Sequence, residues 1–433
     1  MSLSLPTAVD DSICVESLAL RDPLANPLFE RELAQRYLLF DAWVEGERRV
    51  NLHPLLLPPA LHAQAVEAAT STAALIDRVT QHALDDRDEA ALYHFSPDVQ
   101  RLAQAAHRAD DRASLVRVDL LLSENGWRAC EVNADCPGGH NEALGLPHLA
   151  QAAGFWQGIN PTRLVADLVR TLIDMAGDRG AIALVYATAY AEDLQVCALL
   201  QRELRRQGAH AILAAPTALR RRGDRLFIGN DAVAVLYRYF PTEFMEGQRN
   251  LDDIVAAVRA KTLRCLSSFS AIYAQSKLAF ARAHALARDL ASDLRAALRF
   301  LPATHALSDL PVATLHEDRE RWVIKRALGR VGEDVFVGSL LSDEGWKQAL
   351  TMAGEDQARG EVWVAQEFVP QRSIPSPYGP LLATLGAYVL NGRFVGYFAR
   401  LTPHSHASHS ALCLPVFVKH AVPPLTDAVG STD

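Results

Sequence analysis

The chain has 433 residues, of which 49% are hydrophobic and 22% are charged. These fractions are close to those of an average globular protein, so the composition excludes a globally disordered chain. Forty-three Lys and Arg residues stand against 51 Asp and Glu residues, which gives a formal net charge of −8. Because a sequence-independent nucleic-acid binder needs a dense basic surface, we expect no nucleic-acid partner.

The first residues, MSLSLPTAVDDSICVESLALRD, lack a basic segment ahead of an apolar run and do not read as a signal peptide. No stretch reaches the roughly 18 consecutive apolar residues that a membrane-spanning helix needs. The six cysteines contain no CxxC pair, which argues against a disulfide framework and a thiolate zinc site. We therefore expect a cytoplasmic enzyme with no membrane contact.

The first third of the chain has a helical pattern that gives way to a hairpin. Residues 25–115 are mostly helical in their apolar spacing, with prolines as breaks. Residues 115–123 and 127–134 are short, rich in β-branched residues and alternating, which predicts two paired strands. Residues 163–178 return to a helical pattern.

A different alternation follows. Residues 180–216 run strand, helix, strand, which predicts a βαβ unit on a parallel sheet, and residues 232–240 predict a further apolar strand. Residues 251–299 predict a long helical region. From residue 322 to residue 400 the chain is rich in strands with Gly turns. We therefore expect a mixed α/β protein.

The predicted hairpin has a register that can be counted. If residues 124–126 form a three-residue loop, Ser123 lies opposite Trp127. Continuing the count places Asp119 opposite Glu131. A shift of one residue would turn the polar side chains of one strand to the other face.

The same count gathers four polar side chains on one face of the hairpin, because Arg117 then faces Asn133 and Asp119 faces Glu131. Two facing carboxylates destabilise a sheet unless a cation lies between them. Carboxylate and amide oxygens suit a hard ion such as Mg²⁺. Two interpretations stay open: a metal site, or a polar face on which Arg117 itself bridges the acids.

A second group of polar residues lies on the C-terminal strands. Lys325 ends an apolar strand and precedes the turn 329–332, where backbone amides and a nearby ammonium group could hold phosphate oxygens. A plain hairpin turn is the alternative. Gln366 and Glu367 lie on one apolar strand and Arg400 ends another. Buried polar residues need partners, which a nucleotide would supply.

Together these segments resemble the glutathionylspermidine synthase family, the circularly permuted branch of the ATP-grasp ligases. The resemblance extends over roughly residues 117–418. It is carried by the R-x-D of Arg117 and Asp119, the E-x-N-x-D-x-P from Glu131 to Pro137, Ser276-Lys277, Lys325 with its GRVG turn, Gln366-Glu367-Phe368 and Arg400. The hairpin precedes the nucleotide-binding lysines, and this chain order is the mark of the permutation.

The resemblance implies a role for each of these residues. Asp119, Glu131 and Asn133 would bind the Mg²⁺ ion that bridges the phosphates of ATP, and Arg117 would be the catalytic residue that stabilises charge at the reacting centre. The implied nucleotide-binding residues are Lys277, Lys325, Gly329, Arg330, Gly332, Gln366, Glu367 and Arg400.

The implied fold is a mixed α/β (α+β) ATP-grasp fold with circular permutation, a Rossmann-like pre-ATP-grasp domain and a helical N-terminal part. The predicted boundaries are a helical region at 1–115, the metal-binding hairpin and connecting helices of the ligase core at 116–179, the βαβ domain at 180–275, the nucleotide-binding region at 276–420 and a tail at 421–433.

The implied function is an ATP-dependent ligase with ATP and Mg²⁺ as cofactors. It would activate a small-molecule carboxylate as an acyl phosphate, release ADP and join the acyl group to an amine. One alternative is an amino-acid ligase that loads the thiol of a carrier protein, whose acidic surface could be attracted by the basic run 202–225. The other is a non-catalytic nucleotide-binding protein with a degenerate site.

Three histidines follow the last predicted strand. His404, His406 and His409 have the spacing of metal ligands, because an HxH pair on a strand places both rings on one face. The alternative interpretation is a loop near the triphosphate whose histidines contact phosphate or substrate.

Overall fold

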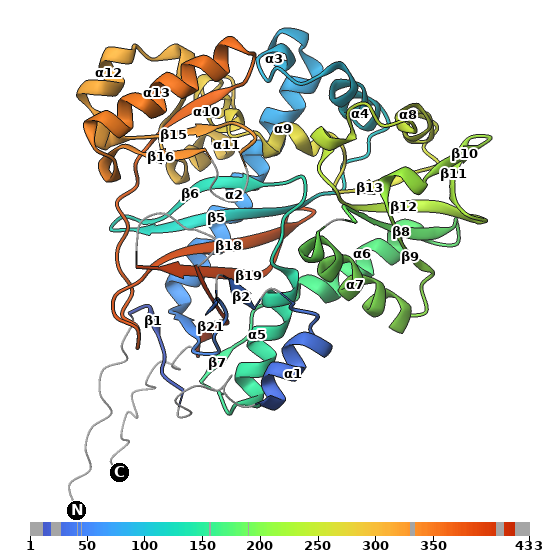
Figure 1. Cartoon of the computed structure of the whole chain (residues 1–433), viewed down its shortest axis with the longest axis horizontal. Helices are drawn as coiled ribbons and strands as arrows, with labels where there is room; N and C mark the ends of the chain where they lie inside the picture. Colours follow the sequence, from blue (N-terminus) through green and yellow to red (C-terminus); the bar gives the residue numbers. More distant parts are fainter. Residues whose placement is uncertain are drawn as a thin grey trace, which may run out of the picture.

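The computed structural model in Figure 1 describes residues 12–18, 27–40, 42–44, 46–155, 157–188, 190–329, 334–403 and 411–420. Within these residues the protein is a mixed α/β structure with five sheets. None of the described helices is both long and apolar enough to cross a bilayer.

The largest antiparallel sheet lies in the middle of the molecule, in the order β20-β19-β18-β5-β6 (Figure 1). Its strands are β5 (Leu115–Ser123), β6 (Gly126–Asn133), β18 (Leu382–Leu390), β19 (Arg393–Thr402) and β20 (Leu412–Leu414). Helix α2 (Pro59–Asp85) begins with Pro59 at its first position, as helices commonly do, and packs across β5, β6, β18 and β19. The predicted hairpin therefore pairs, through β5, with β18, a strand that lies more than 250 residues later in the chain.

The βαβ unit predicted for residues 180–216 is confirmed. β8 (Ala181–Tyr186), α7 (Ala191–Arg206) and β9 (Ala211–Ala214) follow one another, and β8 and β9 are parallel. β12 (Asp231–Tyr239) is also parallel to β8 and lies on the side of β8 opposite β9. β13 (Arg264–Leu266) is parallel to β12. The antiparallel strands β10 (Arg220–Arg222) and β11 (Arg225–Ile228) extend the edge.

Helices cover both faces of this parallel sheet, as buried parallel sheets require. The core on one face is shared with α6 (Leu164–Ala176) and α7. The core on the other face is shared with α4 (Pro97–Arg108) and α8 (Leu251–Arg259).

A small antiparallel sheet forms the C-terminal layer, in the order β14-β17-β15-β16. Its strands are β14 (Thr304–Ala306), β15 (Trp322–Arg326), β16 (Val335–Val337) and β17 (Trp363–Glu367). Helix α13 (Asp343–Ala358), capped by the Ser342 hydroxyl, buries Trp346 in a core with Ile324 and Trp363. The other α-helices of the described residues are α1 (Pro27–Gln35), α3 (Arg87–Ala91), α5 (His140–Ala152), α9 (Ala271–Gln275), α10 (Leu278–Ala285), α11 (Ser292–Ala297) and α12 (Val312–Glu317).

The N-terminal and C-terminal parts of the chain share a sheet, in the order β1-β4-β21-β7. Its strands are β1 (Cys14–Val15), β4 (Leu55–Leu57), β7 (Gly158–Ile159) and β21 (Val416–Lys419). The pair β2 (Trp43–Val44) and β3 (Glu47–Arg48) forms a separate hairpin. The region predicted as helical therefore also supplies short strands.

One prediction about the elements is wrong. Residues 251–299 do not form one helical region, because β13 interrupts it and pairs with β12. A strand of three residues is too short for its alternation to stand out from the surrounding helical pattern. The domain boundaries stay predictions.

Candidate active site

The hairpin β5–β6 carries the predicted polar residues in two facing pairs. Arg117 lies opposite Asn133, and Asp119 lies opposite Glu131. This pairing is the one counted from the sequence and is confirmed. β5 lies between β6 and β18, so Arg117 and Asp119 stand inside the central sheet, whereas Asn133 and Glu131 lie on its edge strand β6.

The turn of this hairpin differs from the prediction. Ser123 pairs with Gly126, which leaves a two-residue loop instead of three residues, and Gly126 has a φ of +93° that favours glycine. The strands stay one residue out of the predicted register as far as the pair Leu120–Ala129. A bulge at Cys130 then restores the predicted register.

Asp119 is the centre of a buried charge cluster, and its side chain is 0% exposed. Its Oδ1 accepts a hydrogen bond from Arg117 Nε at 2.7 Å, and its Oδ2 accepts one from Arg117 Nη2 at 3.0 Å. Arg400 Nη2 donates to the same Oδ2 at 2.6 Å, and Asn133 Nδ2 at 3.3 Å. Gly386 lies beside Asp119 on β18, and a Cβ there would stand 2.7 Å from Arg117 Cδ. The bare glycine therefore leaves room for the guanidinium.

Two guanidinium groups on one carboxylate leave this cluster with excess positive charge. Burial alone would lower the pKa of Arg117, but the ion pair with Asp119 outweighs burial and raises it. Arg400 Nε is buried and finds no hydrogen-bond partner among the described residues. A buried donor without a partner costs free energy, so this end of the cluster suits an anionic ligand.

Glu131 lies at a more open part of the same cluster, with 28% of its side chain exposed. Lys277 Nζ lies 3.8 Å from its Oε2, and Asn133 Nδ2 donates to its Oε1 at 3.3 Å. Burial would raise the pKa of Glu131, but the charges of Lys277, Lys325 and Arg400 outweigh burial and hold that pKa well below its usual range. Glu131 is therefore a carboxylate at neutral pH.

The C-terminal sheet reaches the hairpin through Lys325. Its Nζ donates to Gln366 Oε1 at 2.7 Å and to the backbone carbonyl of Cys130 at 3.3 Å. Gln366 Nε2 in turn donates to Thr304 Oγ1 at 3.3 Å. Because β15 and β17 are paired, the lysine and the glutamine are held side by side. The buried polar residues predicted on these strands thus have partners.

The other predicted residues lie at the border of the cluster or in segments that the structure does not describe. The backbone carbonyl of Gly329 accepts a hydrogen bond from Lys277 Nζ at 2.7 Å. Glu367 lies 3.4 Å from Arg321 in a partly exposed ion pair. The remaining predicted residues lie outside the described residues: Arg330, Gly332, His404, His406 and His409.

Asp135, to which the sequence motifs assign no role, lies in a buried cluster of its own. Its fully buried carboxylate accepts hydrogen bonds from Arg238 Nη2 at 2.6 Å, the backbone N–H of Thr242 at 2.8 Å and the Thr242 hydroxyl at 2.7 Å. Three residues later, the Gly138 carbonyl accepts a hydrogen bond from Arg117 Nη1 at 3.1 Å. Asp135 therefore anchors the loop that supports Arg117. The motif E-x-N-x-D-x-P contains Asp135, but nothing in the sequence pairs it with Arg238.

The carboxyl ends of the parallel strands lie next to this loop. β9 lies on one side of β8 and β12 on the other, so the chain reverses direction across the sheet between β8 and β12. Open parallel sheets bind ligands at the carboxyl ends of their strands at such a point. Tyr239, at the carboxyl end of β12, and Glu192, near the start of α7, have side-chain oxygens 2.7 Å and 3.8 Å from the position of a Cβ on Gly138. The carboxyl ends of these strands therefore adjoin the charge cluster.

The donor atoms of the cluster fit a hard divalent cation. Among the described residues, no three His, Cys, Asp or Glu side chains are grouped so as to hold a metal ion. A metal would therefore rely on Asp119, Glu131 and Asn133, with phosphate or water oxygens in the other positions, as is usual for Mg²⁺. Asp119 Oδ2 already accepts from Arg117, Arg400 and Asn133, whereas Oδ1 accepts from Arg117 alone and keeps a lone pair for a metal ion. Glu131 is partly exposed.

Comparison with solved structures finds similar chains at low sequence identity, and the first of the two described here shares the fold. A glutathione synthetase-like effector from Globodera pallida in its apo form is 14% identical, with a TM-score of 0.59 over 92% of this chain and 98% of that chain. A putative gamma-glutamylcysteine synthetase from Methylobacillus flagellatus KT is also 14% identical, with a TM-score of 0.41 over 80% of this chain and 86% of that chain. No curated protein matches the sequence.

The sequence itself matches a family over most of its length. The match covers residues 59–419, which include the hairpin, the parallel sheet and the C-terminal strands. This confirms the family resemblance carried by the motifs. The chain belongs to the glutathionylspermidine synthase preATP-grasp family.

Proposed function

We propose that the chain is an ATP-dependent carboxylate–amine ligase that forms ADP. The observation that carries this proposal is the gathering of Arg117, Asp119 and Arg400 with Glu131 and two lysines from distant segments of the chain. Phosphoryl transfer requires cations on developing oxygen charge and little covalent chemistry from the protein. The cluster supplies cations and contains no Ser–His or Cys–His pair among its described residues.

The residues of the cluster divide this work by their positions. Arg117 and Arg400 both donate hydrogen bonds to the buried Asp119 and stabilise negative charge on the transferring phosphoryl group and on the acyl phosphate. Lys325 and Lys277 bind phosphate oxygens in place of their present partners, the Gln366 amide and the Gly329 carbonyl. Glu131 and Asn133, with Asp119, hold Mg²⁺. When bound, the ion neutralises the phosphates and orients them for in-line transfer.

The carboxylate and amine substrates bind at the carboxyl ends of β8 and β12. Support comes from the reversal of strand order between these strands and from the place of Gly138, which lies next to both Tyr239 and Arg117. The acyl phosphate would then form next to Arg117. The amine attacks its carbonyl carbon, and inorganic phosphate leaves.

The test is an assay of ADP release with ATP, Mg²⁺ and a panel of carboxylates and amines, beginning with glutathione and spermidine because the family is named for that pair. The expected result is ADP release that needs one carboxylate and one amine together, with an amide product of the matching mass. Asp119→Asn and Arg117→Gln should abolish it, whereas Arg221→Gln, at an exposed arginine of β10, should not.

Two other outcomes would contradict the proposal. ADP release with an amino acid, with the product found as a thioester on a carrier protein, would instead assign the chain as a carrier-protein ligase. ATP binding by calorimetry without ADP release over the whole panel would assign it as a non-catalytic nucleotide-binding protein.

A further inference from the structure

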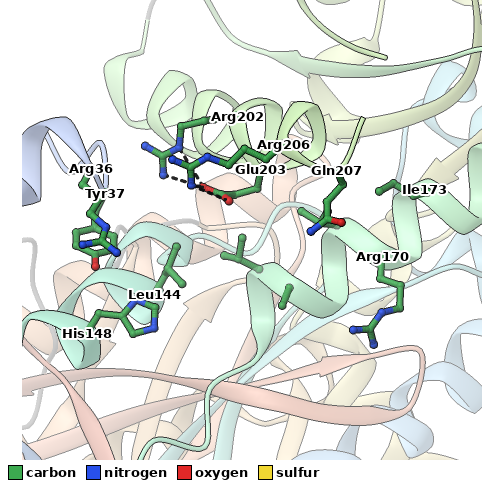
Figure 2. Close-up of a pocket in the computed structure, with 13 residues that line it drawn as sticks. Arg36, Tyr37, Leu144, His148, Arg170, Ile173, Arg202, Glu203, Arg206 and Gln207 are labelled. Atoms are coloured by element: carbon green, nitrogen blue, oxygen red, sulfur yellow. Dashed lines mark hydrogen bonds and ion pairs between the residues drawn. The ribbon is translucent and has the colours of Figure 1, made fainter. Parts of the chain in front are cut away.

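A cavity of about 500 Å³ opens between the end of α1 and helices α5, α6 and α7 (Figure 2). None of the residues that line it belongs to the charge cluster around Asp119. Small-molecule sites commonly have volumes of this size. The cavity is therefore large enough for a ligand other than the substrates of the proposed ligase.

The floor of the cavity is apolar. It is formed by Leu144 of α5 and by Val165, Val169 and Ile173 of α6, of which the two valines are buried. α6 follows an amphipathic pattern, and these residues lie at its i, i+4 and i+8 positions. A ligand that covered this floor would remove apolar surface from water.

The rim of the cavity carries more arginines than acids. Arg36, Arg170, Arg202 and Arg206 line it, and the only acid among its lining residues is Glu203. This excess stands out in a chain with a net charge of −8. Figure 2 shows Arg36 and Arg170 at opposite ends, with Arg202 and Arg206 between them on α7.

Glu203 pairs with two of these arginines at once, so its single charge offsets only one of theirs. Its Oε1 accepts from Arg202 and from Arg206, each at 3.0 Å (Figure 2). Arg36 and Arg170 form ion pairs with Glu32 at 3.2 Å and Asp167 at 3.4 Å, but these arginine side chains are more than half exposed. Exposed pairs of this kind are weak, so a bound anion can compete for these guanidiniums.

The walls of the cavity are held in place without a ligand. The fully buried Asn141 donates from Nδ2 to the Tyr37 carbonyl at 2.8 Å and to the Gln195 carbonyl at 3.1 Å, which ties α5 to the end of α1 and to α7. The Tyr37 ring lies against Gly145, where a Cβ would stand 2.8 Å from the ring. Burial and Arg36 lower the pKa of His148, so at neutral pH this imidazole offers hydrogen bonds without charge.

We propose that this cavity binds a small organic anion that has an apolar body and a phosphate or carboxylate head. The head would lie against Arg202 and Arg206, and the apolar body would cover the side chains of Leu144, Val169 and Ile173. A preformed site with an apolar floor and a few convergent charged groups is the usual arrangement of a small-molecule site. This site is separate from the one proposed for ATP, carboxylate and amine.

Calorimetric titration of the full chain with octyl phosphate tests the proposal, and octanoate distinguishes the two head groups. The neutral n-octanol and inorganic phosphate serve as half-ligands. The expected result is one octyl anion per chain, bound about tenfold or more tightly than either half-ligand, with an affinity that falls as salt is raised. Equal binding of octanol and both anions would overturn the cationic part of the proposal. If neither octyl phosphate nor octanoate binds, the entire proposal of an anion site in this cavity is overturned.

Variants locate the binding. Arg202→Gln with Arg206→Gln should weaken the binding of octyl phosphate about a hundredfold, because two charge-assisted contacts are lost. Ala166→Glu, at an exposed lining position of α6, should weaken it similarly by placing a carboxylate in the cavity and should not disturb the fold. The matched control is Arg221→Gln with Arg222→Gln on β10, outside the cavity. Equal losses in the control and in the cavity variants would show nonspecific anion binding and overturn the proposal.

Discussion

Arg117 holds the buried carboxylate of Asp119 through two parallel contacts, Nε to Oδ1 at 2.7 Å and Nη2 to Oδ2 at 3.0 Å. This bidentate geometry fixes both side chains on one face of the hairpin. It also shows how the two interpretations of the facing acids are related. The arginine compensates Asp119, and the lysines and any metal ion act on Glu131.

The first prediction follows from the burial of this pair. Asp119→Asn should lower the free energy of unfolding by about 3–5 kcal/mol, because Arg117 and Arg400 would be left buried beside a neutral amide. Urea unfolding measures this loss. The control is Asp253→Asn, which removes the partner of Arg221 in an exposed ion pair and should cost at most about 1 kcal/mol. Equal losses in the two variants would contradict the central role of Asp119.

The second prediction concerns pH. Folding lowers the pKa of Glu131 below its usual 4.5, so the unfolded chain binds its proton more readily than the folded chain. The resulting stabilisation is complete above the unfolded pKa and is lost as the pH falls through the lower, folded value. The stability difference between the wild type and Glu131→Gln should therefore be constant near neutral pH and shrink below about pH 4.5.

Urea unfolding at a series of pH values measures this difference. Glu124→Gln, at an exposed residue of the same hairpin loop, is the control and should differ little from the wild type at any of these pH values. A difference for Glu131→Gln that stays constant into the acid range would show that the lysines do not hold this carboxylate in its charged form.

The third prediction tests the nucleotide side of the cluster. Lys325→Ala should weaken ATP binding about tenfold to hundredfold, because a charge-assisted contact to phosphate would be lost. Calorimetry with ATP and Mg²⁺ gives the affinity. Lys347→Ala, at an exposed lysine of α13, should bind ATP as the wild type does. Unchanged affinity in Lys325→Ala would remove this lysine from the nucleotide site.

The fourth prediction treats Asp135 as a positioning residue. Thr242→Val removes one of its hydrogen bonds at nearly constant side-chain volume, and Thr242→Ser keeps that bond. The valine variant should lower kcat for ADP release about tenfold, with little change in the KM for ATP, because the loop that supports Arg117 shifts while the lysines stay in place. The serine variant should restore kcat. A KM that rises with kcat unchanged would contradict this role.

Local patterns in the sequence were sufficient to predict the hairpin pairs but not the way they are reached. Alternation and counting placed Asp119 opposite Glu131, although the predicted loop was one residue too long. The pairs came out right because the bulge at Cys130 cancels that difference. A bulge depends on the packing of the neighbouring strand and leaves no clear pattern in the sequence.

Contacts between distant segments explain most of what the sequence did not predict. Arg400 and Asp119 are 281 residues apart, and Arg238 and Asp135 are 103 residues apart. The motifs named Arg400 and Asp119 as site residues, but only the antiparallel pairing of β18 with β5 and β19 brings them together. Asp135 received no role because its partners, Arg238 and Thr242, lie more than 100 residues later in the chain.

The last prediction uses the close approach at Gly386. A Cβ at this position would stand 2.7 Å from Arg117 Cδ and 3.0 Å from the backbone carbonyl oxygen of Phe398. Gly386→Ala should therefore displace the Arg117 side chain and lower the rate of ADP release. The corresponding increase in activation free energy should exceed the loss in the free energy of unfolding. The matched control is Gly354→Ala on α13, where a Cβ would meet no atom within 4 Å and where alanine favours the helix. If both variants release ADP at the wild-type rate, the exact placement of Arg117 does not limit the reaction.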